Sequence, residues 1–98
     1  MTVQSAAPPT FNPTAEEAYW REAFRREPYY KEPLGYDDYS PAYRVGYTGP
    51  VRRRGEFQAL EQELREDFQR VKGRSRLSWE EAREATRAAW RRVTEHPH

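Results

Sequence analysis

Few residues of this chain are of a type that performs chemistry. There is no cysteine, and the two histidines, His96 and His98, lie within the last three residues. Nucleophilic catalysis needs a hydroxyl or thiol beside a rigidly held base, and two histidines at a chain end lack the third ligand of a zinc site. No glycine-rich phosphate loop or EF-hand pattern occurs either. We therefore expect no catalytic residue, no metal site, no cofactor and no enzymatic activity.

Five arginines form the best candidate for a nucleic-acid site. Arg52, Arg53 and Arg54 are consecutive, and Arg74 and Arg76 follow further along the chain. Guanidinium groups bind phosphates, and nearby tyrosines could stack on unpaired bases. The formal net charge is only +1, from 17 basic and 16 acidic residues, so no strong field attracts nucleic acid. The arginines predict weak, sequence-independent nucleic-acid binding; the alternative is solvated loops that keep the protein soluble.

A series of tyrosines is the candidate partner surface. The spacing i, i+3, i+7 and i+11, which places side chains on one face of a helix, occurs at Tyr36, Tyr39, Tyr43 and Tyr47. Tyrosine and arginine are enriched among the residues that dominate protein interfaces, so these tyrosines and Arg44 are candidates to contact a partner. The alternative is that the tyrosines belong to the core and direct their hydroxyls to water.

The N-terminal part predicts an arm followed by a short helix. Residues 1–13 are rich in Ala and Pro and have little to bury, so we expect a flexible arm. Thr14 and Glu17 have the spacing of a capping box, which predicts a helix that starts there. Pro28 then ends the helix, giving a range of 14–27.

The tyrosine series predicts a second short helix over residues 37–47. Asp37 and Asp38 are placed to cap its start. Pro41 would lie in the first turn, where no intrahelical N–H bond is needed. The segment from Gly46 to Pro50 should then end the helix.

The C-terminal half predicts two longer helices. An apolar stripe with spacings of 3, 4, 4 and 3 predicts a helix over 56–72, which Gly73 should stop, and it consists of Phe57, Leu60, Leu64, Phe68 and Val71. Ser78 and Glu81 form a second capping box, before a helix over 79–94. Its apolar face includes Trp79, Ala82, Thr86, Ala89, Trp90 and Val93. The short connection predicts an antiparallel hairpin with Trp79 and Trp90 in its seam.

These elements predict an all-α fold, a small helical bundle in which two short aromatic helices pack on a C-terminal antiparallel helical hairpin. Hydrophobic residues make up 36% of the chain and aromatic residues 14%, so a single domain over 14–95 must build its core from few, large side chains. No segment approaches the ~20 apolar residues of a membrane span, and the N-terminus lacks the pattern of a secretory signal. With no cysteine, we expect a cytoplasmic protein.

Three segments carry a resemblance. They are EAYWR at 17–21, YDDYSPAYRVG at 36–46 and LSWEEAREATRAAW at 77–90. In these segments the chain resembles a group of small bacterial helical proteins rich in Tyr and Trp, over roughly residues 16 to 93. The resemblance implies a loose association with bacterial stress physiology and brings no established activity or site residue. The arginine triplet is more basic than the group's linker.

The resulting expectation is a non-enzymatic bacterial protein that interacts with an unknown protein partner or with a second copy of itself. The alternative function is weak nucleic-acid binding through the arginine-rich loops. A third function, that of a hydrophilic protectant, is suggested by the 34% of charged residues, but it conflicts with the capped, amphipathic helices.

Overall fold

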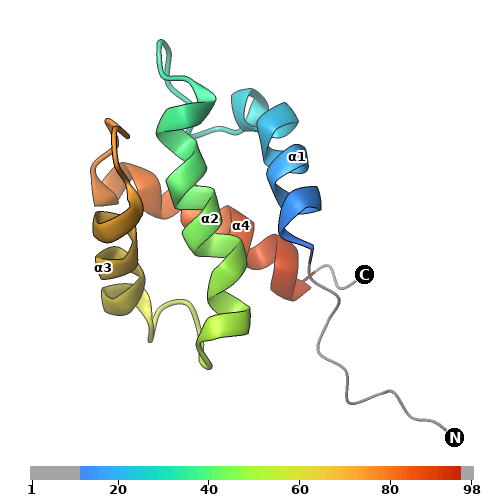
Figure 1. Cartoon of the computed structure of the whole chain (residues 1–98), viewed down its shortest axis with the longest axis vertical. Coiled ribbons are helices and arrows are strands. Elements are labelled where there is room, and N and C mark those ends of the chain that lie inside the picture. Colours follow the sequence, from blue (N-terminus) through green and yellow to red (C-terminus); the bar gives the residue numbers. More distant parts are fainter. Residues whose placement is uncertain (1–11, 96–98) are drawn as a thin grey trace, which may run out of the picture.

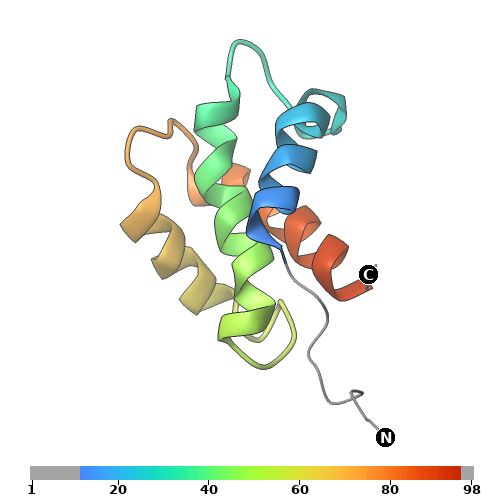
Figure 2. The ribbon, with the colours of Figure 1, turned by 45° about the vertical axis from the view of Figure 1, so that its right-hand side comes forward.

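Helix α2 stands at the centre of the fold. In the computed structural model, which describes residues 12–95, the elements are α1 (Pro13–Ala23), a 3₁₀ turn (Phe24–Arg26), α2 (Tyr36–Arg52), α3 (Glu61–Val71) and α4 (Trp79–Glu95). Helices α1 and α3 flank α2 on opposite sides, and α4 passes behind it (Figure 1). The turned view shows α4 emerging beside α1 (Figure 2). The predicted all-α helical bundle is confirmed, since residues 12–95 contain no strand.

Helix α1 begins one residue earlier than expected, and its cap is a different residue. The side-chain oxygen of Asn12 accepts hydrogen bonds from the backbone N–H groups of Thr14 (3.0 Å) and Ala15 (3.2 Å). Pro13 takes the first helical position, where its missing N–H costs nothing. The prediction of a Thr14 cap was therefore wrong, because Asn12 satisfies the same orphan donors. The rest of the predicted arm, residues 1–11, lies outside the described residues.

Helix α2 is longer at its C-terminal end than the sequence predicted. Asp38 caps its start as expected, because its carboxylate accepts from the Gly35 N–H at 3.1 Å. Pro41 lies in the second turn instead of the first, and the helix continues through Gly46 and Pro50 to Arg52. The predicted end at residues 46–50 was wrong, because contact with α4 keeps this glycine-containing segment helical.

That contact depends on the two glycines of α2. A Cβ atom at Gly46 would lie 2.2 Å from the carbonyl oxygen of Thr86, and one at Gly49 would lie 2.5 Å from the ring of Trp90. The buried Thr86 hydroxyl also donates to the carbonyl of Ala42 at 3.0 Å. The α2 backbone can therefore approach α4 only where it carries no side chain.

Helix α3 is shorter than predicted and stops where predicted. Residues 57–60 form a turn, in which the Leu60 N–H donates to the carbonyls of Glu56 and Phe57, both at 3.1 Å. The helix itself starts at Glu61, so the predicted start at 56 was wrong. Gly73 follows the helix with φ of +52°, a left-handed conformation that glycine adopts without strain.

Helix α4 closely follows its prediction. The Ser78 N–H donates to Glu81 Oε1 at 2.9 Å and the Glu81 N–H donates to Ser78 Oγ at 3.2 Å, so the capping box is confirmed. The predicted apolar face is buried throughout. The ring centroids of Trp79 and Phe68 are 6.0 Å apart, and those of Trp90 and Phe57 are 5.7 Å apart. The two tryptophans therefore contact the segment around α3. Along its middle, however, α4 lies against α2 (Figure 1).

One aromatic core joins all the helices of the described region. Trp20 of α1 stacks on Tyr43 of α2 with ring centroids 4.5 Å apart and planes at 13°. Leu64 and Phe68 of α3 and Ala85 of α4 are completely buried in the same cluster. Fully burying an aromatic side chain contributes about 2–3 kcal/mol, so these few large residues supply most of the hydrophobic stabilisation.

Candidate interaction surfaces

The tyrosine series of α2 belongs to the core. The exposed fractions of Tyr39, Tyr43 and Tyr47 are 1%, 0% and 3%, and Tyr36 is half-buried. This corrects their interpretation as a partner surface: α2 is the central helix, so its aromatic face is covered by its neighbours. Of the predicted surface, only Arg44 is exposed.

The buried tyrosine hydroxyls hydrogen-bond to the protein instead of pointing to water. The hydroxyls of Tyr29 and Tyr43 lie 2.8 Å apart, and the Tyr39 hydroxyl accepts from the Lys31 N–H at 3.1 Å. Burial raises the pKa values of Tyr29 and Tyr43 well above the ordinary value of 10.0. Both groups are therefore neutral at physiological pH, and their role is to hold the 28–35 connector on α2.

Arg53 of the predicted nucleic-acid set is held by a buried carboxylate. Its Nε and Nη2 atoms donate to the two oxygens of Asp67, at 3.1 and 3.0 Å. Arg70 donates to the same carboxylate. This bidentate pair fastens the end of α2 to α3, so the Arg53 guanidinium is already occupied.

Arg76 is held in the same way at the other end of α3. Its Nε and Nη2 donate to Asp38 at 3.1 and 2.8 Å, and its backbone N–H adds a third bond at 2.9 Å. These hydrogen bonds lower the pKa of the buried Asp38 carboxyl from 3.8 to about 2. Neighbouring Arg74 is exposed and contacts no carboxylate among residues 12–95.

The five predicted arginines therefore form two separate groups. The triplet lies at the C-terminus of α2, beginning with its last residue, Arg52, whereas Arg74 and Arg76 lie in the loop between α3 and α4, at the opposite end of α3 (Figure 1). An 11-residue helix spans about 16 Å at 1.5 Å per residue. The structure does not bring the five side chains into one basic patch.

A groove opens at the C-terminal end of α2, and we call it the α2-end groove. It has a volume of ≈ 460 Å³ and is lined by Pro50, Val51, Arg52, Arg53, Arg54, Val93 and Thr94. Val51 is 50% exposed and, with Tyr19 and Val71, is one of the three exposed large apolar residues among residues 12–95. Arg52 and Arg54 are exposed, and neither contacts a carboxylate within the described part of the chain. The groove thus combines apolar walls with two available cations.

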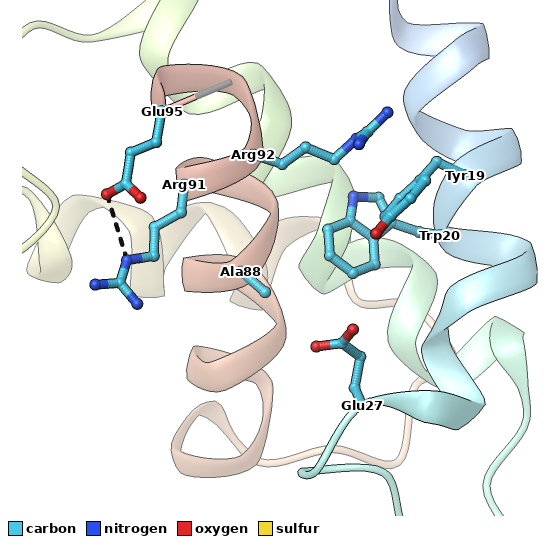
Figure 3. Close-up of a pocket in the computed structure, with 7 residues that line it drawn as sticks. All are labelled: Tyr19, Trp20, Glu27, Ala88, Arg91, Arg92 and Glu95. Atoms are coloured by element: carbon cyan, nitrogen blue, oxygen red, sulfur yellow. Dashed lines mark ion pairs between the residues drawn. The ribbon is translucent and has the colours of Figure 1, made fainter. Parts of the chain in front are cut away.

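A second hollow lies between α1 and α4, and we call it the α1–α4 pocket. Its volume is ≈ 570 Å³, and its lining is Tyr19, Trp20, Glu27, Ala88, Arg91, Arg92 and Glu95 (Figure 3). Arg92 covers one side, with its guanidinium carbon 3.7 Å from the centre of the Tyr19 ring. Its Nε also donates to the buried Glu16 carboxylate at 3.0 Å. Arg92 therefore joins α1 to α4.

Glu27 differs from the other charged residues that line this pocket. Its carboxylate points from the end of the 3₁₀ turn toward α4, below the Trp20 ring (Figure 3). Burial raises its pKa above 4.5, although nearby Arg26 partly offsets the effect. The Glu27 carboxylate forms no hydrogen bond or ion pair within residues 12–95. The buried Trp20 Nε1–H, on the edge of the ring away from Glu27 (Figure 3), also has no acceptor there. Sequence reasoning missed this pocket, since a lone Glu before Pro28 gives no signal that a distant helix will face it.

Among residues 12–95, no group of three or more His, Cys, Asp and Glu side chains is placed to hold a metal ion. His96 and His98 lie outside this region. In the same part of the chain, none of the helices combines the length and apolar character required to cross a lipid bilayer.

The chain was also compared with known proteins. No protein family, curated protein or solved structure matches it. Its function must therefore be argued from the two surfaces described above.

Proposed function

We propose that this chain is a non-enzymatic interaction module of the bacterial cytoplasm that docks on a protein partner through the α2-end groove. The observation that carries the proposal is the contrast within the arginine triplet. Arg53 is held by Asp67, whereas Arg52 and Arg54 are exposed beside Val51 without a carboxylate among the described residues. The stress association implied by the resemblance belongs to the same proposal.

The chemistry of the groove favours a partner segment that carries carboxylates beside an apolar side chain. Val51, Pro50 and Val93 offer an apolar seat, and covering an exposed valine contributes about 1 kcal/mol. Exposed ion pairs to Arg52 and Arg54 would add only about 0.2–1 kcal/mol each. A stable complex buries about 1,600 Å² in total, so the groove by itself supports a weak, reversible contact.

Nucleic acid is the less favoured occupant. With Arg53 and Arg76 occupied by carboxylates, the α2-end groove offers two free guanidinium groups. Two phosphate contacts would give a log–log salt slope of only about −2. The apolar wall beside them would have no role on a phosphate backbone, whereas it would contribute to binding an acidic, apolar peptide.

Peptide binding tests the proposal. The probes are fluorescent peptides that combine Glu with Leu or Phe, and the same peptides with Lys in place of Glu. We expect the acidic peptides to bind the wild-type protein. Their affinity should be at least tenfold lower for the variant R52E/R54E and unchanged for the variant R65E/R74E. Arg65 and Arg74 are suitable controls because they are exposed and form no ion pair among residues 12–95.

Two outcomes would contradict the proposal. One is equal loss of peptide binding in both double variants, which would reduce the effect to net charge. The other is that no acidic, apolar peptide binds, whereas single-stranded DNA binds and loses affinity in R52E/R54E. That result would assign the groove to nucleic acid.

A further inference from the structure

The α1–α4 pocket contains one charged side chain that forms no ion pair within residues 12–95. Arg91 pairs with Glu95 at 3.5 Å and Arg92 pairs with Glu16 at 3.0 Å. Among the charged residues that line the pocket, Glu27 alone has no such partner within residues 12–95. Burying a carboxylate is costly, and nearby Arg26 offsets that cost for Glu27 only in part. A positive charge that arrives from outside relieves the remainder.

The walls around Glu27 suit an alkyl chain. The side chain of Trp20 closes the inner side, held by its stack on Tyr43. Ala88 of α4 contributes only a methyl group, which leaves the space beside it open (Figure 3). An aromatic ring and a methyl group beside a carboxylate attract a cation that carries apolar carbon atoms.

The two arginines do not turn the pocket into an anion site. In Figure 3 the Arg91 guanidinium points away from Trp20, and that of Arg92 extends past Tyr19 on the opposite side from Glu27. Each already has a carboxylate. A metal ion is also a poor fit, because Ca²⁺ requires six to eight oxygen ligands and Mg²⁺ requires near-octahedral ligation.

We propose that the α1–α4 pocket binds a primary alkylammonium group, with Glu27 as its counter-ion and Trp20 and Ala88 as its apolar wall. The group is either a lysine side chain of another protein or a small free amine, since both present the same chemistry. The proposal does not depend on the α2-end groove. A ligand of a few heavy atoms has a limited binding energy, so we expect a dissociation constant on the order of millimolar for the smallest amines.

Nuclear magnetic resonance on the isotope-labelled full chain provides the test. The Trp20 indole N–H and the Ala88 amide report on the pocket, and n-butylammonium, n-butanol and butyrate are titrated as cationic, neutral and anionic probes of the same length. Only n-butylammonium should produce saturable shifts at both groups. The pKa of the Glu27 carboxyl should fall on binding, because a cation opposes the effect of burial.

Variants separate the roles of charge and space. E27Q should weaken binding at least tenfold, whereas E32Q, which alters an exposed glutamate outside the pocket lining, should leave it unchanged. A88L should fill the space and abolish the saturable shift while Glu27 remains. A well-dispersed spectrum of each variant confirms that it is folded.

The source of the amine is read from a second probe, a short peptide with one lysine. Tighter binding of the peptide than of n-butylammonium supports a partner's lysine, and equal binding supports a free amine. The proposal is overturned if butyrate or butanol produces the same shifts, or if E27Q binds n-butylammonium as the wild type does. Shifts that do not saturate would also overturn it.

Discussion

Replacing Gly46 with alanine should destabilise the fold, although the same change inside an exposed helix normally stabilises it by about 1 kcal/mol. The new Cβ would lie 2.2 Å from the carbonyl oxygen of Thr86 and 2.8 Å from Cβ of Ala89. Both obstacles belong to the rigid body of α4. The two helices must therefore separate locally by roughly 1 Å to restore a normal contact distance of about 3.5 Å.

The cost follows from what this separation breaks. The Thr86 hydroxyl lies 3.0 Å from the Ala42 carbonyl and is fully buried, so a shift of roughly 1 Å would lose a hydrogen bond of about 1 kcal/mol. Overfilling a close-packed interface costs about a further 1–3 kcal/mol. After subtracting the gain in helix propensity, we expect a net loss of about 2 kcal/mol, equivalent to about 8–16 °C in Tm.

Thermal and urea unfolding followed by circular dichroism measures this loss. Two matched glycine variants provide the scale. G49A should lower stability by less than G46A does, because the nearest atoms belong to the ring of Trp90, which can rotate. G35A should change stability by less than about 1 kcal/mol, because no atom lies within 4 Å of the new Cβ. If G46A is as stable as the wild type, or loses no more than G35A, α2 and α4 do not meet as described.

Three further predictions concern the buried charges and tyrosines. R92A removes a cation bound to the buried Glu16 and should lower the free energy of unfolding, measured in urea, by about 3 kcal/mol. A loss below about 1 kcal/mol would show that the pair is not desolvated. The folded-state pKa of Asp38 is lowered from 3.8 to about 2, so its stabilising contribution is complete above pH 4 and is lost as the pH falls toward 2. Urea midpoints between pH 5 and pH 2 should decline less steeply in D38N than in the wild type. Because the pKa values of Tyr29 and Tyr43 are raised by burial, both should stay protonated at pH 11 in an ultraviolet absorbance titration, and ionisation of all tyrosines while the chain is folded would contradict their burial.

Local signals were sufficient for much of the secondary structure. The capping box of Ser78 and Glu81, the buried face of α4 and the stop at Gly73 were all predicted and are present. The capping box and the helix stop depend on groups within about four residues of one another, and the apolar stripe of α4 repeats at the same spacing, so nearby sequence contains these signals. The same reasoning failed at Thr14, where a competing cap at Asn12 lies only two residues away.

The length of α2 and the candidate surfaces depended on tertiary structure. Gly46 and Pro50 look like a helix end, yet close contact with α4 outweighs their weak local preferences. Arg76 looked like a free cation until the fold placed it on Asp38, 38 residues earlier in the chain. Composition and periodicity determine by themselves that the chain forms capped, amphipathic helices. Which charges are paired, and that Glu27 faces an open pocket, is decided only when helix faces meet, because electrostatic and steric contacts depend on distance in space and not along the chain.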